Sequence, residues 1–252
     1  VTAVPPHAAA ASPGRDVATP AGPLPARQEA LADLAARGVD VLRYPGAEEP
    51  VLSRTELLIQ RAMRRLRPDP VPEEVLRRLI WAATRAPNGG NVQPWRFLVV
   101  QEAGPKAALQ RIYAGEWAKY VAAMPPASSA LAGANRQYSA GQYLADHLHE
   151  APALIIPCGF LLEVNTGIAS GSSIFPAVQN LLLAARALGL GATLTTLHRH
   201  NEDAVRQLLG IPENAHTAAL IPVGWPLGKF GPVNRRPIED VTYWDRWGAK
   251  RT

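Results

Sequence analysis

The chain has 252 residues, of which 47% are hydrophobic, and this content supports a packed core and excludes a chain that is disordered throughout. Its formal net charge of +5 fits either nucleic acid or an anionic ligand. Five arginines and one glutamate give residues 54–67 a net charge of +4, and no Lys/Arg tract with interleaved aromatics continues it. We therefore expect a local anion site and no nucleic-acid partner.

Membrane and secretory segments are not expected. Arg186 interrupts the longest apolar candidate, residues 174–197, before it reaches the roughly 18 to 20 residues of a membrane helix. Residues 1–30 lack a basic start followed by an unbroken apolar segment, so they do not resemble a secretory signal. We expect a soluble, cytoplasmic protein without a membrane partner. The single cysteine, Cys158, excludes an internal disulfide, and its apolar surroundings indicate a buried, inert thiol.

The N-terminal fifty residues are expected to form an arm that is partly flexible. Residues 1–25 contain seven alanines and six prolines, which bury little and sustain no helical hydrogen bonding. A short helix is expected over 26–37, where Gly38 follows the apolar positions. The compact domain is expected to begin near Ser53, so that 1–50 forms the arm and 51–252 the domain.

Two helices are predicted next. Apolar residues recur every four positions from Thr55 to Leu66, which predicts a helix that carries Arg61 and Arg64 or Arg65 on one face. The proline-rich run 68–72 would end it. A second helix is expected from Pro72 to before Pro87, with two glutamates in its first turn and a buried apolar stripe.

Further elements follow without a regular βαβ alternation. A turn is expected at 88–91 and a strand at 96–100, whereas 103–150 gives little structural guidance. The remaining expected strands are 153–160, 191–196 and 218–224, and the expected helices are 173–189 and 202–209, the latter closed by Gly210. This order of elements favours an α+β domain.

Several kinds of catalytic site are absent from the sequence. It contains no G-x-S-x-G elbow, P-loop, dinucleotide-binding glycine motif or metal-spaced cysteine pair. The pairs His147/His149 and His198/His200 lack the spacing that places two imidazoles on one helical face. We expect these histidines to be solvated or hydrogen-bonded, and we expect no metal site.

Four segments carry a family resemblance. They read QRAMRRL at 60–66, APNGGNVQPWRF at 86–97, QNLLLAARALGLG at 179–191 and NRRPI at 234–238. In this order and spacing they resemble the nitroreductase superfamily, over about residues 54–240. The resemblance implies an α+β nitroreductase-like fold, with a mostly antiparallel central sheet flanked by helices. It also implies an intertwined homodimer that binds one FMN per subunit with residues of both chains.

The resemblance also implies a set of cofactor contacts in the first and fourth segments. Arg61 and Arg235 match positions that bind the FMN phosphate, for which bidentate guanidinium groups are suited. Ala62 replaces a serine of the family pattern, so its amide remains as the phosphate donor there. Arg64 matches the basic residue at the pyrimidine edge, where a positive charge stabilises the reduced flavin.

Two other segments complete the implied FMN site. Pro87, Asn88 and Asn91 lie in the turn that reaches the partner subunit's flavin, although Asn88 replaces a serine of the family pattern. The stretch 193–196 matches the one whose amides or hydroxyls meet flavin N5 and O4, and it contains Leu194, Thr195 and Thr196. No match identifies a catalytic residue of the protein itself.

The implied activity is transfer of hydride from NAD(P)H through flavin N5 to a small acceptor such as a nitroaromatic, quinone or enone. Two different functions also fit the pattern: a flavin-dependent dehydrogenase, oxidase or dehalogenase acting on a natural product, and a non-catalytic flavin-binding protein. Residues 103–150 would supply the variable substrate pocket. Residues 237–252 would form a C-terminal arm that lies over the other subunit, because its Tyr243, Trp244 and Trp247 are too aromatic for a free tail.

Overall fold

A computed structural model describes residues 60–124, 136–160, 171–231 and 233–251, and the structural statements below concern these residues. The expected arm at 1–50, the helix at 26–37 and the start of the domain near Ser53 lie outside them. None of the described helices has the length and apolar content needed to cross a bilayer.

An antiparallel sheet forms the centre of the fold. Strand β2 (Ala153–Gly159) pairs along one edge with β1 (Trp95–Val100). Along its other edge β2 pairs with β5 (Ile221–Gly224) and β4 (His216–Thr217), and β5 pairs in turn with β3 (Gly191–Ala192). Every pairing between these strands is antiparallel, which confirms the predicted α+β class and the mostly antiparallel sheet.

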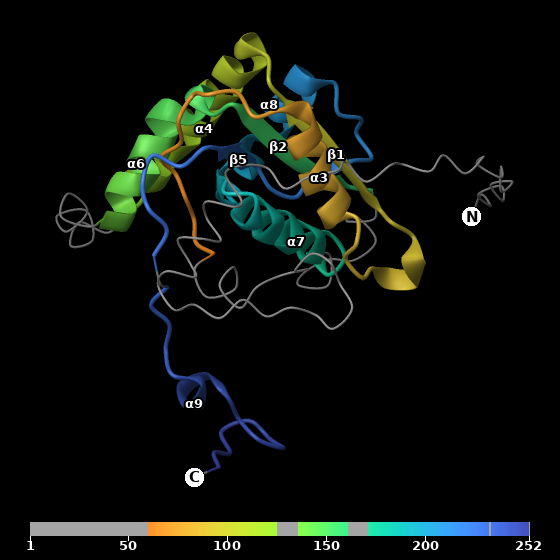
Figure 1. Cartoon of the computed structure of the whole chain (residues 1–252), viewed down its shortest axis with the longest axis vertical. Coiled ribbons are helices and arrows are strands. Elements are labelled where there is room, and N and C mark those ends of the chain that lie inside the picture. The colour runs from red at the N-terminus through yellow and green to blue at the C-terminus, as the bar shows by residue number, and fades with distance from the viewer. Residues whose placement is uncertain (1–59, 125–135, 161–170, 232, 252) are drawn as a thin grey trace, which may run out of the picture.

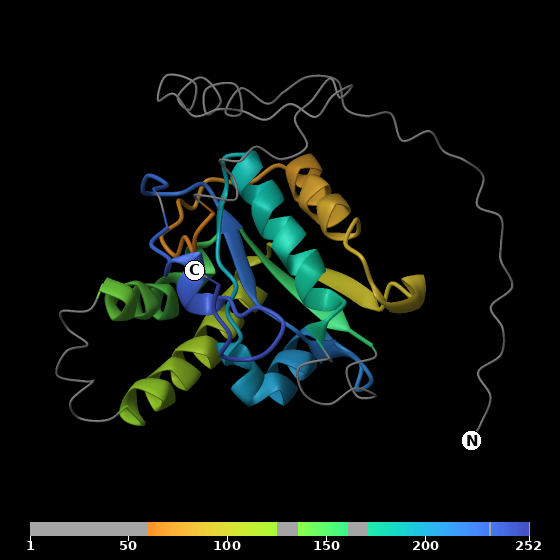
Figure 2. The ribbon, with the colours of Figure 1, turned by 90° about the horizontal axis from the view of Figure 1, so that it is seen from below.

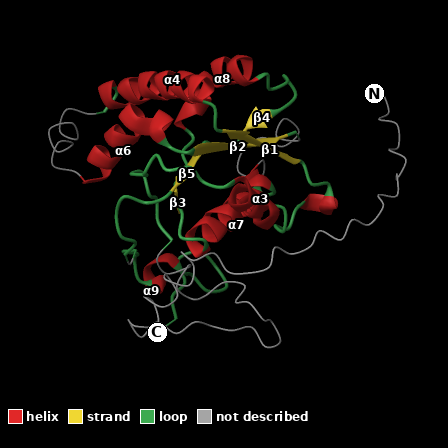
Figure 3. Cartoon of the chain, turned by 45° about the horizontal axis from the view of Figure 1, so that its top comes forward, coloured by secondary structure: helices red, strands yellow, loops and turns green. Residues whose placement is uncertain are grey.

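Helices cover both faces of this sheet (Figures 1 and 3). Side chains alternate between the two faces along a strand, and β2 directs Ile155 to one hydrophobic cluster and Leu154 and Ile156 to another. The first cluster is shared with α3 (Glu73–Ala83) and α7 (Ile174–Ala187). The second is shared with α4 (Ala103–Ala122), α6 (Arg136–His147), the short η2 (Leu148–Glu150) and α8 (Glu202–Leu209).

The helices with clear sequence signals are confirmed. Helix α3 follows Pro72, has Glu73 and Glu74 in its first turn and buries four apolar residues. Figure 2 shows α3 and α7 side by side, and the Asn180 side-chain amide donates to the Ala82 carbonyl oxygen at 3.3 Å between them. Helix α8 ends at Gly210, whose φ of 65° is the left-handed conformation that glycine adopts without strain.

The predicted helix ending at Leu66 is wrong over its described part, residues 60–66. This segment is extended and adds to the sheet: the Met63 amide donates to the Ala192 carbonyl at 3.0 Å, and the Arg67 amide to the Trp225 carbonyl at 2.7 Å. A bridge between Leu66 and Pro226 continues the pairing. These tertiary hydrogen bonds replace those of a helix, so Arg61 and Arg64 do not share a helical face.

Gly191 allows residues 63–66 to pack closely on strand β3. A Cβ atom at Gly191 would lie 2.8 Å from Leu66 Cδ2 and 3.0 Å from Met63 Cβ, closer than packed carbon atoms approach. The extended segment therefore packs directly on the backbone of β3. A larger side chain at this position would push residues 63–66 away from the sheet.

The four predicted strands have different bounds in the structure, and the one expected at 153–160 ends one residue earlier, at Gly159. Strand β3 has only two of the six residues expected at 191–196, although Thr195 forms an isolated bridge with Leu220. The strand expected at 218–224 begins at Ile221, and the one expected at 96–100 begins one residue earlier, at Trp95. The described parts of 103–150, which gave little guidance, include α4 and α6, and both helices pack on the core.

The C-terminal segment projects away from the sheet and its helices (Figure 1). It contains the short helix α9 (Ile238–Val241), and several of its large apolar side chains are exposed, including Trp247 at 89%. The segment is folded on itself, because the Trp244 amide donates to the Ala249 carbonyl at 2.9 Å and the Tyr243 and Trp247 rings lie 4.9 Å apart.

Candidate functional site

The arginines of the extended segment fall into two groups. Arg65 lies over the Tyr143 ring at 4.1 Å, and Arg67 forms an ion pair with Asp69 at 3.0 Å. Arg61 and Arg64 are half-buried residues, and within the described part of the chain their guanidinium groups make no hydrogen bond or ion pair. Half-buried cations without an anionic partner are suited to bind an anionic ligand.

Arg64 belongs to a polar cluster with residues from two other elements. The Tyr113 hydroxyl, on α4, lies 3.1 Å from Thr195 Oγ1 and so joins α4 to the stretch after β3. Burial raises the pKa of Tyr113, and the hydrogen bond with Thr195 and the positive charge of Arg64 oppose this shift. The structure therefore brings together two of the predicted site residues, Arg64 and Thr195.

The backbone of Thr195 is fully engaged. Its amide donates to the Leu220 carbonyl at 3.0 Å, and its carbonyl accepts from the Leu220 amide at 2.8 Å. The side-chain hydroxyl is therefore the donor that Thr195 can offer a ligand. The neighbouring Leu194 and Thr196 are exposed, so the stretch borders open space.

Pro87, Asn88 and Asn91 lie elsewhere. The turn predicted at 88–91 is confirmed as η1 (Gly89–Asn91), with Asn91 at a φ of 53°. The Asn88 side-chain oxygen accepts from the Gln93 amide at 2.8 Å. Figures 1 and 2 place this turn across α3 and α7 from residues 60–67, so the chain does not bring these predicted residues to Arg61 and Arg64.

The two arginines predicted to bind the phosphate, Arg61 and Arg235, come from different parts of the chain. Arg235 is exposed, and its guanidinium donates to the carbonyl of its own neighbour Asn234 at 2.9 Å. A Cβ atom at Gly231 would lie 3.7 Å from the Arg61 guanidinium, so the chain passes Arg61 four residues before Arg235. Ala62 is exposed beside Arg61.

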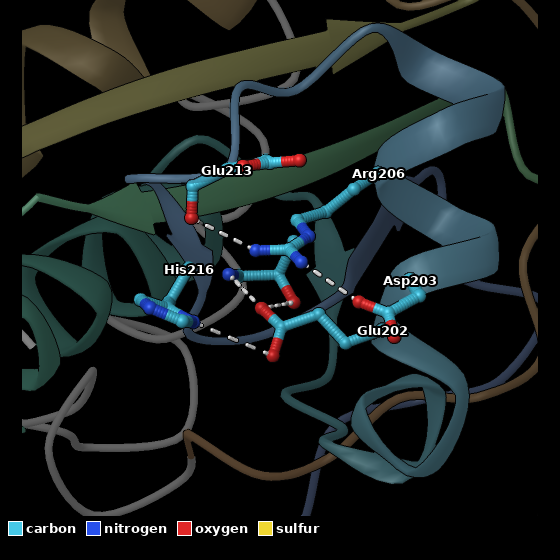
Figure 4. A network of polar contacts seen from close by, with 6 residues as sticks. Glu202, Asp203, Arg206, Glu213 and His216 are labelled. Atoms are coloured by element: carbon cyan, nitrogen blue, oxygen red, sulfur yellow. Dashed lines mark hydrogen bonds and ion pairs between the residues drawn. The ribbon is translucent and has the colours of Figure 1, made fainter. Parts of the chain in front are cut away.

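A carboxylate network supports the stretch that carries Thr195 (Figure 4). Glu202, at the start of α8, accepts hydrogen bonds from the Thr217 amide and from the Thr217 hydroxyl at 2.9 Å. Arg206 links Asp203, at 2.7 Å, to the Glu213 carbonyl at 3.0 Å. These bonds fix the start of α8 to β4. The turn η4 (Leu197–Asn201) joins Thr195 to α8, so its C-terminal end is fixed as well.

Two titratable groups are buried beside this network. Burial, followed by the charge of Glu202, raises the pKa of Cys158 to about 11, in accord with the predicted inert thiol. Burial lowers the pKa of His198 to about 4. Neither ring nitrogen of His198 has a hydrogen-bond partner among the described residues, so the prediction of a solvated or hydrogen-bonded histidine is wrong at this position. Helix α4 packs over η4 and excludes water from the ring.

Among the described residues, the other histidines are not part of a cluster that could hold a metal ion. His147 contacts Glu150 at 2.9 Å, as expected for a hydrogen-bonded histidine. The described residues contain no group of three or more histidine, cysteine, aspartate or glutamate side chains that could share a metal ion.

Tyr113 is the member of this polar cluster that the sequence did not indicate. It lies in the 103–150 region, where no motif or periodicity singled it out, and Thr195 is 82 positions further along the chain. Only the packing of α4 against η4 brings the two hydroxyl groups together. A lone tyrosine in a helix gives no local signal for such a contact.

Comparison with known proteins identifies the family. The Nitroreductase family model matches residues 60–225, so the chain belongs to the nitroreductase family. It is 35% identical over 206 residues to an NADH dehydrogenase of Thermus thermophilus, covering 77% of this chain and 97% of that protein. It is 29% identical over 194 residues to a 5,6-dimethylbenzimidazole synthase of Rhodospirillum rubrum, covering 71% of this chain and 87% of the relative.

A solved structure shows the same fold. Iodotyrosine deiodinase bound to FMN and 3-iodo-L-tyrosine aligns with a TM-score of 0.60 at 24% identity, over 75% of this chain and 95% of the deiodinase chain. This match confirms the nitroreductase-like fold predicted from the four sequence segments.

Proposed function

We propose that this protein is an FMN-dependent oxidoreductase whose cofactor binds beside Arg61, Arg64 and Thr195. The observation that carries the proposal is the pair of half-buried arginines, Arg61 and Arg64, whose guanidinium groups make no ion pair within the described residues. The phosphate dianion of FMN would satisfy Arg61, and the electron-rich pyrimidine edge of its ring would lie against Arg64. The Thr195 hydroxyl adds a neutral donor for a ring nitrogen or carbonyl. The donor set therefore fits FMN.

In this proposal each part of the site has its own task. Arg61, the Ala62 amide and Arg235 hold the phosphate, whereas Arg64 holds positive charge against the pyrimidine edge. Residues 194–196 meet the N5 and O4 edge. The bound flavin supplies the hydride chemistry, so the protein has to bind, orient and exclude water rather than provide an acid or base of its own.

We further propose a homodimer that completes the site. The turn that carries Pro87, Asn88 and Asn91 lies across α3 and α7 from residues 60–67 (Figures 1 and 2), and in this proposal it serves the Arg61 cluster of the partner subunit. Exposed Trp244 and Trp247 at the C-terminus provide apolar surface for the same partner. A chain lacking 240–252 should then lose both dimer stability and flavin content. Sedimentation at low concentration tests this, and an intact, fully flavinylated dimer would contradict it.

The proposed reaction takes hydride from NAD(P)H and passes it to a nitroaromatic, quinone or enone. Its support is the name of the Thermus thermophilus relative, an NADH dehydrogenase that the chain covers over 97% of its length. A dehalogenase acting on a small aromatic is a second candidate, favoured by the fold shared with iodotyrosine deiodinase. A dehydrogenase or oxidase of a natural product and a non-catalytic flavin-binding protein complete the set of candidates.

Two measurements test the proposal. The purified protein should absorb like a flavin and release FMN on heating, and a protein that takes up no FMN would overturn the proposal. Steady-state oxidation of NADH and NADPH with menadione or a nitrofuran then separates the candidates. Turnover supports the reductase, whereas bound FMN without turnover favours the dehalogenase or the non-catalytic protein.

A further inference from the structure

We propose that Tyr113 is a positioning residue that directs the Thr195 hydroxyl hydrogen toward N5 of the flavin. The inference rests on the proposed function and adds to it a residue from α4 that the family segments do not include. It starts from the 3.1 Å contact between the Tyr113 hydroxyl and Thr195 Oγ1.

The hydrogen-bonding capacity of Thr195 is limited. Its backbone amide and carbonyl are both engaged with Leu220, so only the hydroxyl can serve a ligand. That hydroxyl has one hydrogen to donate and two lone pairs to accept with. The Leu197 amide lies 3.5 Å from Thr195 Oγ1 and can only donate, so it takes up one of the lone pairs.

The direction of the Tyr113 contact follows from the chemistry of the two hydroxyls. A phenol is more acidic than an aliphatic alcohol and is the better donor of the pair. The positive charge of Arg64 lowers the pKa of Tyr113 and so makes its hydroxyl a stronger hydrogen-bond donor. Because burial raises the pKa of Tyr113 above its ordinary value, the phenol keeps this hydrogen at neutral pH.

Tyr113 therefore donates to Thr195, and both lone pairs of the Thr195 oxygen are occupied. The remaining hydrogen has to point out of this cluster, toward the open side bordered by the exposed Leu194 and Thr196. Without the Tyr113 hydroxyl, the Thr195 hydrogen can turn inward and a ligand loses its donor. An aromatic ring at position 113 alone would not preserve the orientation.

The test compares the binding of FMN with that of 5-deaza-FMN, in which a C–H group replaces N5 and cannot accept a hydrogen bond. When the flavin-free protein is titrated with each flavin, one such hydrogen bond contributes on the order of a tenfold higher affinity for FMN than for 5-deaza-FMN. In Tyr113→Phe and in Thr195→Val we expect this preference to fall below about threefold. Tyr120→Phe is the matched control, since Tyr120 lies exposed on the same helix, and it should keep the full preference.

The outcomes separate this inference from the proposed function. A Tyr113→Phe protein that keeps the wild-type preference overturns the inference, as does a wild type that binds both flavins equally. A wild type that binds neither flavin overturns the proposed function and the inference with it. Melting temperatures of the flavin-free variants check folding, and the retained phenyl ring in Tyr113→Phe avoids a cavity.

Discussion

The two faces of the sheet bury different kinds of side chain. Toward α3 and α7 the buried cluster consists of aliphatic residues and Trp95. Toward α4 and α8 the cluster meets polar and titratable groups that are also buried: Tyr113, Cys158, His198 and Thr217. The candidate site borders this second face through Tyr113 and Thr195.

The apolar face of the sheet contributes to stability, whereas the face with buried polar groups borders the candidate site. Burial moves the pKa of three titratable groups on the second face in the direction that keeps them uncharged at neutral pH: Tyr113 and Cys158 upward, His198 downward. Arg64, which makes no ion pair among the described residues, thus has the neutral phenol of Tyr113 as a neighbour. The cluster on the apolar face consists of hydrophobic side chains and contributes through packing.

The largest effect is expected from the core of β2. Ile155 and Leu154 are adjacent, fully buried and directed to opposite faces. Either residue changed to alanine should lower the free energy of unfolding by about 2–5 kcal/mol, measured in urea, because each substitution leaves a cavity. Only Leu154→Ala should also weaken FMN binding, since it loosens the packing under α4. Equal FMN affinities in the two variants would remove the functional distinction between the faces.

The next largest effect concerns the phosphate. Arg61→Ala should weaken FMN binding by about 1.5–3 kcal/mol, the size of a charge-assisted contact. Arg235→Ala should have a similar effect, because the family pattern assigns Arg235 to the phosphate. Arg67→Ala is the matched control, because Arg67 already forms an ion pair with Asp69. This substitution should leave the FMN affinity unchanged. Fluorescence titration of the flavin-free proteins measures all three. Wild-type affinity in Arg61→Ala would place the phosphate elsewhere.

The pH dependence of stability tests the polar face directly. Above pH 6.5 His198 is neutral in both the folded and the unfolded state and contributes nothing. As the pH falls from 6.5 toward 4, the unfolded chain binds a proton that the folded chain refuses, because burial holds the folded pKa at about 4. Stability should therefore decrease by about 2 kcal/mol between pH 7.5 and 5 on account of this residue. His198→Leu should show a correspondingly flatter profile, and an equal slope in both proteins would refute the assignment.

The smallest effect concerns the flavin potential. Arg64→Ala should lower the midpoint potential by roughly 20 to 45 mV, equivalent to about 1–2 kcal/mol, because positive charge favours the reduced flavin. Arg64→Lys should restore most of the potential, since a point charge is enough at this edge. Redox titration of the three proteins measures the shift. An unchanged potential in Arg64→Ala would move this guanidinium to the phosphate or to solvent.

Local signals predicted three of the described helices, α3, α7 and α8, and the central strand β2. Helix α3 combines a starting proline, acidic residues in the first turn and an apolar stripe, and α8 ends on a glycine, so both elements carry their own start and stop signals. The run at 153–160 is apolar without alternation because β2 is buried on both faces. The four family segments also predicted the fold, and its comparison with iodotyrosine deiodinase bears this out.

The site depended more on tertiary structure. The residues expected near the cofactor were known from the family pattern, but their contacts were not. Apolar residues every four positions at 55–66 predicted a helix, whereas residues 60–66 are extended. The reason is that Ala192 and Trp225 offer backbone carbonyls to this segment at the edge of the sheet, and a sequence window contains no information about such distant acceptors.

The sequence by itself determined the family, the helices with complete boundary signals and the arginines available for an anion. Tertiary structure alone decided which of these arginines stay unpaired within the described residues, because the partners Tyr143 and Asp69 take Arg65 and Arg67. It also decided that Tyr113 meets Thr195 across 82 positions of the chain. Contacts between residues so far apart depend on how α4 packs over the sheet, and packing is a property of the assembled core rather than of any segment in it.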